Sequence, residues 1–387
     1  MDDDIFVKNM NFIPRLLENI VVGRLFKAKV IVIYGARQVG KTTLVKRILE
    51  RFGNDGRYLN CELLPVQEGL SKDDPESIRA FLGKYRVVVL DEAQNIEGIE
   101  KKLKIIVDEL PDIQIIATGS SAFEFANAIS EPLTGRSFKF VLYPLSFKEV
   151  EDSTDLINAK SKIEFMMRYG LFPEVFSLSE SEAKERLIYL VSDYLYKDIF
   201  GFERLKKSTI IKNLLQLIAL QIGSEVSYNE LAQKIGINRL TVLNYLDILE
   251  QNFIIFRLNS FSRNLRNEIS RGVKIYFYDL GIRNALINNF NPLNLRSDVG
   301  ALWENFCILE RKKLNDYNLR HKNTYFWRTY DQKEIDYIEE ADGGLKAYEF
   351  KWGSTHKSRF PEEFARTYGG EFEVVDRENF YKFLNRD

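Results

Sequence analysis

One short stretch of the sequence combines glycines, a lysine and threonines in a spacing that suits the binding of phosphate groups. It has the form G-x-x-x-x-G-K-[ST], and with the residue that follows it consists of Gly35, Ala36, Arg37, Gln38, Val39, Gly40, Lys41, Thr42 and Thr43. An apolar run precedes it and a helical pattern follows it, which is the context that a phosphate-binding loop requires. Its backbone N–H groups would face the phosphates, Lys41 would reach the β- and γ-phosphates, and the Thr42 hydroxyl would bind Mg²⁺. We therefore predict that this loop binds ATP and Mg²⁺.

Two adjacent acidic residues follow a second apolar run, at 87–90. In open α/β sheets ligands bind at the carboxyl ends of the strands, so Asp91 and Glu92 are placed to complete a nucleotide site. Asp91 would hold Mg²⁺ directly or through water, and Glu92 would act as the general base that polarises the attacking water. The alternative is an ordinary strand that ends in a charged turn. The phosphate-binding loop about 50 residues upstream favours the functional interpretation.

Three more polar side chains are candidates for this site. A third apolar run ends in a segment that contains Thr118 and Ser120, and a hydroxyl there would sense the γ-phosphate or position water. The sequence does not choose between the two. Arg136 is either an arginine finger, which stabilises charge in the transition state, or a structural turn residue.

Acidic residues and a lysine also gather near the C-terminus. Strand alternation places Glu334 and Asp336 on one face, and Glu349 and Lys351 likewise share a face. The turn at 339–344 can join the two strands as a hairpin, so that Asp336, Glu349 and Lys351 converge. Hard oxygen ligands suit Mg²⁺, and a lysine beside the metal can activate water. Cross-strand ion pairs with no catalytic role are the alternative.

A helix-turn-helix pattern occupies residues 227–257. An apolar face precedes a turn at Gly236, Asn238 can cap a second helix, and an apolar strand follows, which together predict a winged helix. In DNA-binding proteins the N-terminal part of the second helix enters the major groove. The residues that would contact DNA are Lys234, Arg239, Thr241 and Asn244. Winged helices also dock proteins or act as lids, and both interpretations stay open.

The remaining elements divide the chain into segments. Short apolar runs at 30–34, 87–90, 113–117 and 138–142 alternate with helical patterns, for example at 99–109, which predicts an α/β fold with a parallel sheet. Residues 152–207 are expected to be helical, with a break at 170–173. The segment 201–275 is basic, with eleven Lys and Arg against six Asp and Glu. Mixed strands and helices follow from about residue 274.

Composition limits the possible functions. The 387 residues suggest two or three domains, and 55 Lys and Arg nearly balance 56 Asp and Glu, so any nucleic-acid-binding surface must be local. Two cysteines and two histidines make a zinc site improbable. The acidic N-terminus does not resemble a signal peptide, and no apolar run approaches the length of a membrane span. We expect a cytoplasmic protein with reduced thiols and no membrane association.

Five strings, taken in order, carry a family resemblance: YGARQVGKTTL, VVLDEAQNI, IIATGSSAF, LTGRSFKFVLYPLSFKEV and YGLFPEV. They resemble the archaeal and bacterial AAA-type ATPases (AAA_14 core) that carry a C-terminal DUF4143 domain, which is itself similar to PD-(D/E)XK nucleases. The resemblance implies an AAA+ core with sheet order 5-1-4-3-2 and a helical lid. In the nuclease-like domain it implies that Asp336 and Glu349 bind metal, that Lys351 acts on water and that Glu304 completes the site. Ile335 stands where the nuclease pattern has Pro, and no sensor-2 arginine can be matched.

These observations predict four parts: an ATPase core at 1–150, a helical lid at 151–207, a winged helix at 208–273 and a nuclease-like α/β domain at 274–387. The leading hypothesis is a Mg²⁺-dependent ATPase that acts on DNA. The main alternative is a nucleotide-driven switch or scaffold that binds a protein partner and has an inactive nuclease fold. A transcription regulator whose ATPase gates DNA binding is a third hypothesis, and a homo-oligomer is compatible with all three.

Overall fold

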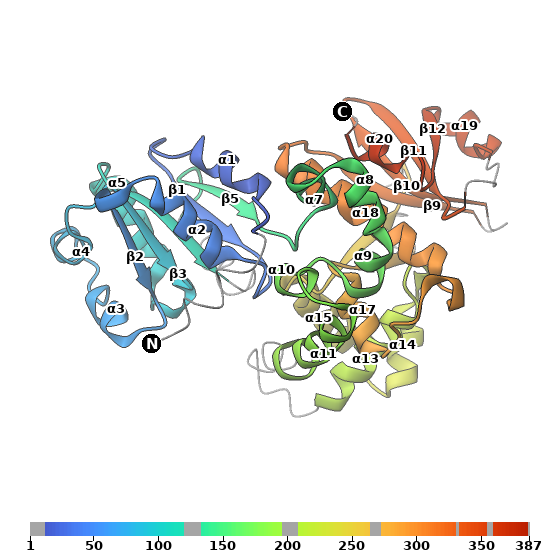
Figure 1. The fold of residues 1–387 in the computed structure, drawn as a ribbon, viewed down its shortest axis with the longest axis horizontal. Coiled ribbons are helices and arrows are strands. Elements are labelled where there is room, and N and C mark those ends of the chain that lie inside the picture. The colour runs from blue at the N-terminus through green and yellow to red at the C-terminus, as the bar shows by residue number, and fades with distance from the viewer. Residues whose placement is uncertain are drawn as a thin grey trace. The chain divides into compact units, whose positions relative to one another are not determined.

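The computed structural model describes residues 12–119, 133–195, 208–263, 272–329, 333–353 and 359–385. The chain forms two compact units, which are seen separately in Figure 1. The first unit comprises residues 1–145 together with 251–253, and the second comprises 146–250 and 254–387. In the described part of the chain, no helix is both long enough and apolar enough to cross a membrane.

The described part of the first unit is built on a five-stranded sheet. Its strands are β1 (Val30–Tyr34), β2 (Gly56–Asn60), β3 (Val87–Asp91), β4 (Gln114–Gly119) and β5 (Ser137–Val141). They lie in the order β2-β3-β4-β1-β5, and every neighbouring pair is parallel. The order 5-1-4-3-2 that the resemblance implies is therefore confirmed. The three central strands β1, β3 and β4 are buried along their whole length, as expected of a parallel sheet that is covered on both faces.

Helix α1 (Leu16–Val22) precedes β1, and further helices connect the strands (Figure 1). The connecting helices are α2 (Lys41–Glu50), α3 (Leu64–Gly69), α4 (Pro75–Leu82) and α5 (Ile99–Glu109), with short 3-10 turns at Gly53–Asp55 and Ala93–Asn95. The predicted helix at 99–109 coincides with α5. Strand β2 was not predicted, because it is only half-buried and lacks the continuous apolar run of the central strands.

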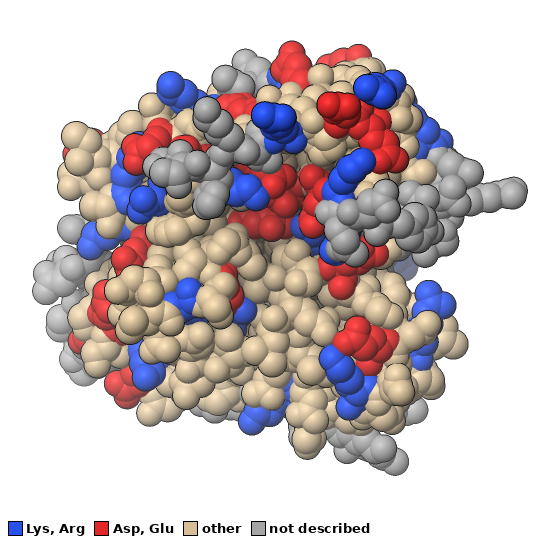
Figure 2. Space-filling view, turned by 90° about the vertical axis from the view of Figure 1, so that its right-hand side faces the viewer, with Lys and Arg blue, Asp and Glu red and all other residues tan. Residues whose placement is uncertain are grey.

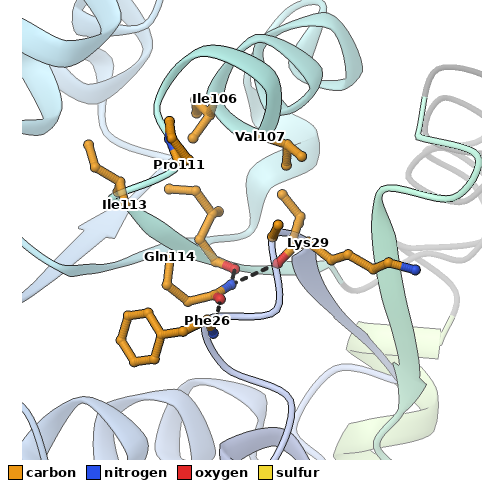
Figure 3. A pocket seen from close by; sticks show the side chains of 10 residues that line it. Phe26, Lys29, Ile106, Val107, Pro111, Ile113 and Gln114 are labelled. Atoms are coloured by element: carbon orange, nitrogen blue, oxygen red, sulfur yellow. Dashed lines mark hydrogen bonds between the residues drawn. The ribbon is translucent and has the colours of Figure 1, made fainter.

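The segment before β1 is attached to β4 through the side chain of Gln114 (Figure 3). Its Oε1 accepts a hydrogen bond from the backbone N–H of Phe26 at 2.6 Å, and its Nε2 donates to the carbonyl of Lys29 at 2.9 Å. Phe26 and Ala28 have φ values of 58° and 54°, which non-glycine residues rarely adopt. The cavity beside them measures about 20 Å³, room for about one water molecule. We therefore assign this pocket to the packing of the segment before β1 against the amino ends of β1 and β4.

The second unit begins with a helical segment, as predicted. Its helices are α7 (Phe147–Ser153), α8 (Leu156–Ser161), α9 (Ile163–Tyr169), α10 (Pro173–Phe176) and α11 (Glu180–Tyr189), followed by a π-helix at Leu190–Leu195. The predicted break lies between α9 and α10. There Gly170 has a φ of 78°, and a Cβ on it would lie 2.1 Å from Oδ1 of Asp279. The buried Asp279 carboxylate accepts hydrogen bonds from the N–H groups of Leu171 (2.7 Å) and Ile282 (3.1 Å), which fixes the break.

A helix-turn-helix follows in the structure. Helix α13 (Ser208–Leu220) and strand β6 (Glu225–Val226) precede α14 (Tyr228–Ile235) and α15 (Arg239–Gln251). Gly236 ends α14 in the left-handed conformation, with a φ of 77°. Oδ1 of Asn238 accepts a hydrogen bond from the N–H of Thr241 at 2.7 Å, so the predicted cap is confirmed. The structure thus contains the predicted helix, turn and helix, and the assignment as a winged helix stays a prediction.

A seven-stranded sheet joins this segment to the C-terminal residues in the described part of the second unit. Its order is β12-β11-β10-β9-β7-β8-β6. The further strands are β7 (Ile255–Ser260), β8 (Val273–Phe277), β9 (Asn323–Arg328), β10 (Glu334–Ala341), β11 (Gly344–Phe350) and β12 (Glu371–Val375). Strands β7 and β9 pair in parallel, so one sheet continues across the predicted boundary at 273/274, which itself falls within β8.

The helices of the C-terminal segment lie between the strands of this sheet or after the last of them in the sequence. They are α17 (Leu280–Leu286), α18 (Val299–Tyr317), α19 (Glu362–Tyr368) and α20 (Phe380–Asn385), with a 3-10 turn at Leu293–Leu295. The long helix α18 is buried along most of its length and carries Glu304. The predicted hairpin is present as the antiparallel pair β10 and β11.

Candidate functional site

The predicted phosphate-binding loop connects the end of β1 to the start of α2. Gly40 precedes the first residue of α2 and has a φ of 96°, a conformation that favours glycine. A Cβ on Gly35 would lie 2.2 Å from the carbonyl oxygen of Leu142, so only glycine lets the chain pass this close to the residue after β5. The two glycines of the motif therefore have separate backbone roles. They shape the loop at the N-terminus of α2, and phosphate binding there stays a prediction.

Lys41 lies within the loop and is almost completely buried, with 4% of its surface exposed. Its Nζ donates hydrogen bonds to the carbonyls of Gly35 (3.0 Å) and Ala36 (3.1 Å). Oε1 of Glu92 lies 3.9 Å from the same ammonium group. The lysine of the loop and the predicted general base are thus neighbours, although 51 positions separate them in the sequence.

Asp91 ends β3 and is the centre of a hydrogen-bond network. Its Oδ2 accepts from the hydroxyls of Thr42 at 2.7 Å and Tyr58 at 2.5 Å, and its Oδ1 accepts from the Thr118 hydroxyl. Burial and the hydrogen bond to Asp91 raise the pKa of Tyr58, which keeps the phenol protonated as a donor. A carboxylate and a threonine hydroxyl in contact are oxygen ligands of the type that Mg²⁺ prefers. The predicted pair Thr42 and Asp91 therefore fits this metal.

Glu92 adopts a backbone conformation that is rare for a non-glycine residue, with φ 54° and ψ 48°. Thr118 Oγ1 accepts a hydrogen bond from the Glu92 N–H at 3.1 Å, and Gln94 Nε2 donates to Glu92 Oε2 at 2.6 Å. Left-handed residues of this kind are enriched at active sites, where the surroundings hold them in place. Of the two predicted hydroxyl candidates, Thr118 contacts both acidic residues, and Ser120 lies outside the described residues.

Arg136 lies away from this network within its own chain. Its carbonyl accepts a hydrogen bond from the N–H of Val30 at 2.9 Å, at the amino ends of β5 and β1. The phosphate-binding loop is at the other end of β1, about 16 Å away for a five-residue strand. The Arg136 guanidinium instead pairs with Asp108 at 2.7 Å on the surface. Arg136 was predicted to be either an arginine finger or a structural turn residue. Within this chain, its contacts agree with the structural role.

A second group of charged side chains lies in the second unit. We call Glu304, Glu334, Asp336 and Glu349 the carboxylate cluster. Lys351 Nζ contacts Glu349 Oε1 at 2.6 Å, and Asp336 Oδ2 accepts from the N–H of Phe350 at 2.8 Å. Burial, together with the charges of Glu304 and Glu349, raises the pKa of Asp336 well above its usual range. The structure thus brings the predicted residues Glu304, Asp336, Glu349 and Lys351 together.

Lys274 was not predicted as a site residue, yet it lies among these carboxylates. Its Nζ is 2.5 Å from Oε1 of Glu334, 2.9 Å from Oε1 of Glu304 and 4.0 Å from Oδ1 of Asp336. Across the part of the chain that the structure describes, no three His, Cys, Asp or Glu side chains are arranged to hold a metal ion. The metal-binding role of Glu304, Asp336 and Glu349 stays a prediction. In the structure, the Lys274 ammonium contacts Glu304 and Glu334 and lies near Asp336.

The second unit contains a cleft of about 900 Å³. Arg239 at the start of α15 and Arg328 at the end of β9 both line it, as does Phe326, whose ring centre lies 5.5 Å from Lys274 Nζ. Glu225 and Glu363 also line the cleft, so both basic and acidic groups border it. Figure 2 shows acidic side chains gathered in a hollow on the face that it presents.

The four predicted DNA contacts differ in their surroundings. Arg239 and Asn244 are exposed and Thr241 is half-buried, all on α15. Nζ of Lys234 on α14 forms an ion pair with Oε1 of Glu230, one helical turn earlier, at 2.5 Å. The N-terminal part of α15 is therefore accessible, while the Lys234 charge is partly compensated by its neighbour.

Three known protein families match parts of this chain. Residues 27–151 match the AAA domain family AAA_14, residues 160–293 match the domain of unknown function DUF8612, and residues 299–383 match the domain of unknown function DUF4143. The chain therefore carries an AAA-type P-loop NTPase domain and a DUF4143 domain. The match to AAA_14 covers the whole candidate nucleotide site, and the match to DUF4143 covers all four residues of the carboxylate cluster.

Similar proteins occur in bacteria and archaea, and their names state no function. An uncharacterized protein of Mycobacterium tuberculosis is 25% identical over 334 residues, covering 86% of this chain and 72% of its own length. One from Methanocaldococcus jannaschii is 25% identical over 310 residues, which cover 75% of this chain and 68% of that protein. One from Haemophilus influenzae is 23% identical over 327 residues, covering 79% and 78%. The resemblance thus extends over most of the chain.

Among solved structures, the Pif1 helicase from Candida albicans aligns with 46% of this chain and 48% of its own, with a TM-score of 0.28 and 15% identity. A TM-score this low does not bear on the fold or the function of this protein.

Proposed function

We propose that the first unit is a Mg²⁺-dependent ATPase. The observation that carries this proposal is the convergence of Thr42 and Thr118 on the carboxylate of Asp91, with Lys41 beside Glu92. These side chains come from α2, β3 and β4, which meet at the carboxyl edge of a parallel sheet. This edge is where ligands bind in open α/β folds.

Each residue then has a separate role in hydrolysis. The loop N–H groups and Lys41 bind the phosphates, and Thr42 and Asp91 hold Mg²⁺, which would neutralise charge on the phosphate oxygens. Glu92 accepts the proton of the attacking water as general base. Thr118 contacts both Asp91 and the Glu92 backbone, so it positions the metal ligand relative to the base.

The variant Lys41→Ala tests the nucleotide site. We expect it to lose tight binding of a fluorescent ATP analogue and to release no phosphate above background, because the β- and γ-phosphates lose their positive partner. Lys104→Ala is the matched control, since Lys104 is an exposed lysine of the same unit, on α5. Normal turnover by Lys41→Ala would reject the site.

We further propose that the second unit binds duplex DNA through the N-terminal part of α15. The favouring observation is that Arg239 and Asn244 are exposed there and that Arg239 lines a large cleft together with Arg328. In helix-turn-helix proteins this part of the second helix contacts base edges. Binding would respond to the nucleotide state of the first unit, as γ-phosphate loss commonly drives such switches.

Salt dependence distinguishes DNA from a protein partner. We expect the anisotropy of a labelled duplex to report binding that weakens steeply with KCl, because phosphate contacts release counterions. Arg239→Ala should weaken binding at every salt concentration, whereas Lys162→Ala, an exposed lysine between α8 and α9, should not. If the native chain binds no duplex in any nucleotide state, the switch that binds a protein partner becomes the better hypothesis.

A further inference from the structure

Lys274 is a lysine in the middle of a buried strand. It lies on β8, which is buried at all five positions, and only 1% of its surface is exposed. Buried ammonium groups are strongly disfavoured unless oxygen acceptors compensate for the lost water. Here the acceptors come from two elements far away in the sequence: Glu304 on α18, and Glu334 on β10.

The two acceptors hold the Lys274 ammonium at close range. Nζ lies 2.9 Å from Glu304 Oε1, within the range of charge-assisted hydrogen bonds, and 2.5 Å from Glu334 Oε1. The hydroxyl of Tyr276, two residues along the same strand, donates a hydrogen bond to the same Glu304 oxygen at 2.5 Å. Glu304 is thus held by two donors of β8, and Lys274 bridges β8, α18 and β10.

The charges of the site show why one cation is needed there. The carboxylate cluster brings four acidic groups together, and the structure places two ammonium groups against them. Lys351 pairs with Glu349 at its edge, with 34% of the Lys351 side chain exposed. Lys274 is the interior partner, and Asp336 Oδ1 lies 4.0 Å from its Nζ. Without it, Glu304, Glu334 and Asp336 would repel one another in a buried region.

We propose that the Lys274 ammonium is the resident cation of the carboxylate cluster and takes the place of a divalent metal ion there. An ammonium group donates hydrogen bonds to oxygens and has no lone pair with which to ligate a metal. A divalent ion held by the same oxygens would lie within a few ångströms of a like charge in a poorly solvated site. The cluster is therefore a lysine–carboxylate centre that joins β8 to α18 and β10. This makes the second unit a binding module and not a metal-dependent nuclease.

Manganese binding in the absence of nucleotide tests this proposal. We expect titrations of the native chain with Mn²⁺, followed by electron paramagnetic resonance, to be unchanged by Asp336→Asn. Lys274→Met keeps an unbranched side chain that is one atom shorter and removes the charge. This variant should gain one Mn²⁺ site per chain, and the double variant with Asp336→Asn should lose that site again. Lys274→Arg is the matched control, because it keeps the cation and should gain no site.

Two results would overturn the proposal. One is Mn²⁺ binding by the native chain that Asp336→Asn removes, since the carboxylates would then hold a metal beside Lys274. The other is a folded Lys274→Met, judged by circular dichroism, that gains no Mn²⁺ site. If Lys274→Met does not fold, the comparison of the native chain with Asp336→Asn decides alone: an unchanged titration supports the resident ammonium, and a lost site rejects it. The ATPase proposal is unaffected by either result, because its residues lie in the other unit.

Discussion

The hydroxyl of Tyr58 donates a hydrogen bond of 2.5 Å to Oδ2 of Asp91, the same oxygen that accepts from Thr42 at 2.7 Å. Tyr58 comes from the edge strand β2, which pairs in parallel with β3 and places Tyr58 opposite Val89. The phenol therefore restrains one oxygen of the carboxylate that we assign to Mg²⁺. The other oxygen accepts a hydrogen bond from the Thr118 hydroxyl.

Tyr58→Phe removes this restraint and keeps the ring. We expect about a tenfold higher Mg²⁺ requirement for ATP hydrolysis, because a hydrogen bond to a charged group contributes about 1.5 kcal/mol. Phosphate release measured over a range of Mg²⁺ concentrations at saturating ATP checks this. Tyr85→Phe, at an exposed position of the same unit, is the control. An unchanged Mg²⁺ dependence in Tyr58→Phe would mean that the contact has no part in metal binding.

Glu92→Gln separates nucleotide binding from turnover. The amide retains the size of the side chain but cannot take a proton from water, so we expect ATP to bind normally and turnover to fall by a factor of about 10²–10⁴. Binding is measured by fluorescence anisotropy and turnover by phosphate release. Glu97→Gln, an exposed glutamate of the same unit, should leave both unchanged. Hydrolysis at the native rate by Glu92→Gln would show that the general base is another group.

Arg136→Ala examines the predicted arginine finger. Because Arg136 lies at the amino edge of the sheet and pairs with Asp108, we expect turnover per chain at high dilution to be unchanged. The exposed ion pair should also add little to stability. If activity of the native chain rises with protein concentration and Arg136→Ala abolishes that rise, the arginine acts on the site of a second copy. Measurement of turnover across a dilution series distinguishes the two roles.

Asp279 should make the stability of the second unit depend on pH. Burial raises the pKa of its carboxyl to about 6, although the N–H groups of Leu171 and Ile282 oppose this shift. The folded state therefore binds this proton more tightly than the unfolded state, whose carboxyl keeps its usual pKa near 3.8. It follows that the free energy of unfolding falls as pH rises from about 4 to about 6, by up to roughly 3 kcal/mol, and does not change further above that range.

Thermal unfolding at a series of pH values tests this assignment. Asp279→Asn cannot titrate, and it loses one of the two backbone hydrogen bonds, so it should be less stable than the native chain at pH about 4. That deficit should shrink as pH rises, because the native chain then buries a charge that the variant lacks. Asp152→Asn, at an exposed position of α7, should show the native pH dependence. A constant difference between Asp279→Asn and the native chain would contradict the raised pKa.

Much of the first unit was predictable because its signals are local. Strands β1 and β3 and helix α5 begin within the predicted runs, and Lys41, Thr42, Asp91 and Glu92 each follow directly from a motif beside such a run. A buried parallel strand has to be apolar throughout, and a phosphate-binding loop has to contain its glycines, so both leave a pattern in consecutive residues. The helix-turn-helix and its Asn238 cap could be predicted from the sequence for the same reason.

Tertiary structure alone decided which side chains meet across the sheets. Tyr58 lies in a half-buried strand without an apolar run, and only its pairing with β3 brings its hydroxyl to Asp91. The direction of β5 places Arg136 at the edge of the sheet opposite the loop. Lys274 stands in a short strand of ordinary composition, and its role arises only when α18 and β10 bring Glu304 and Glu334 to it. The burial of a segment is visible in the pattern of its own residues. The charged partners of a buried side chain come from distant segments, and only folding brings them together.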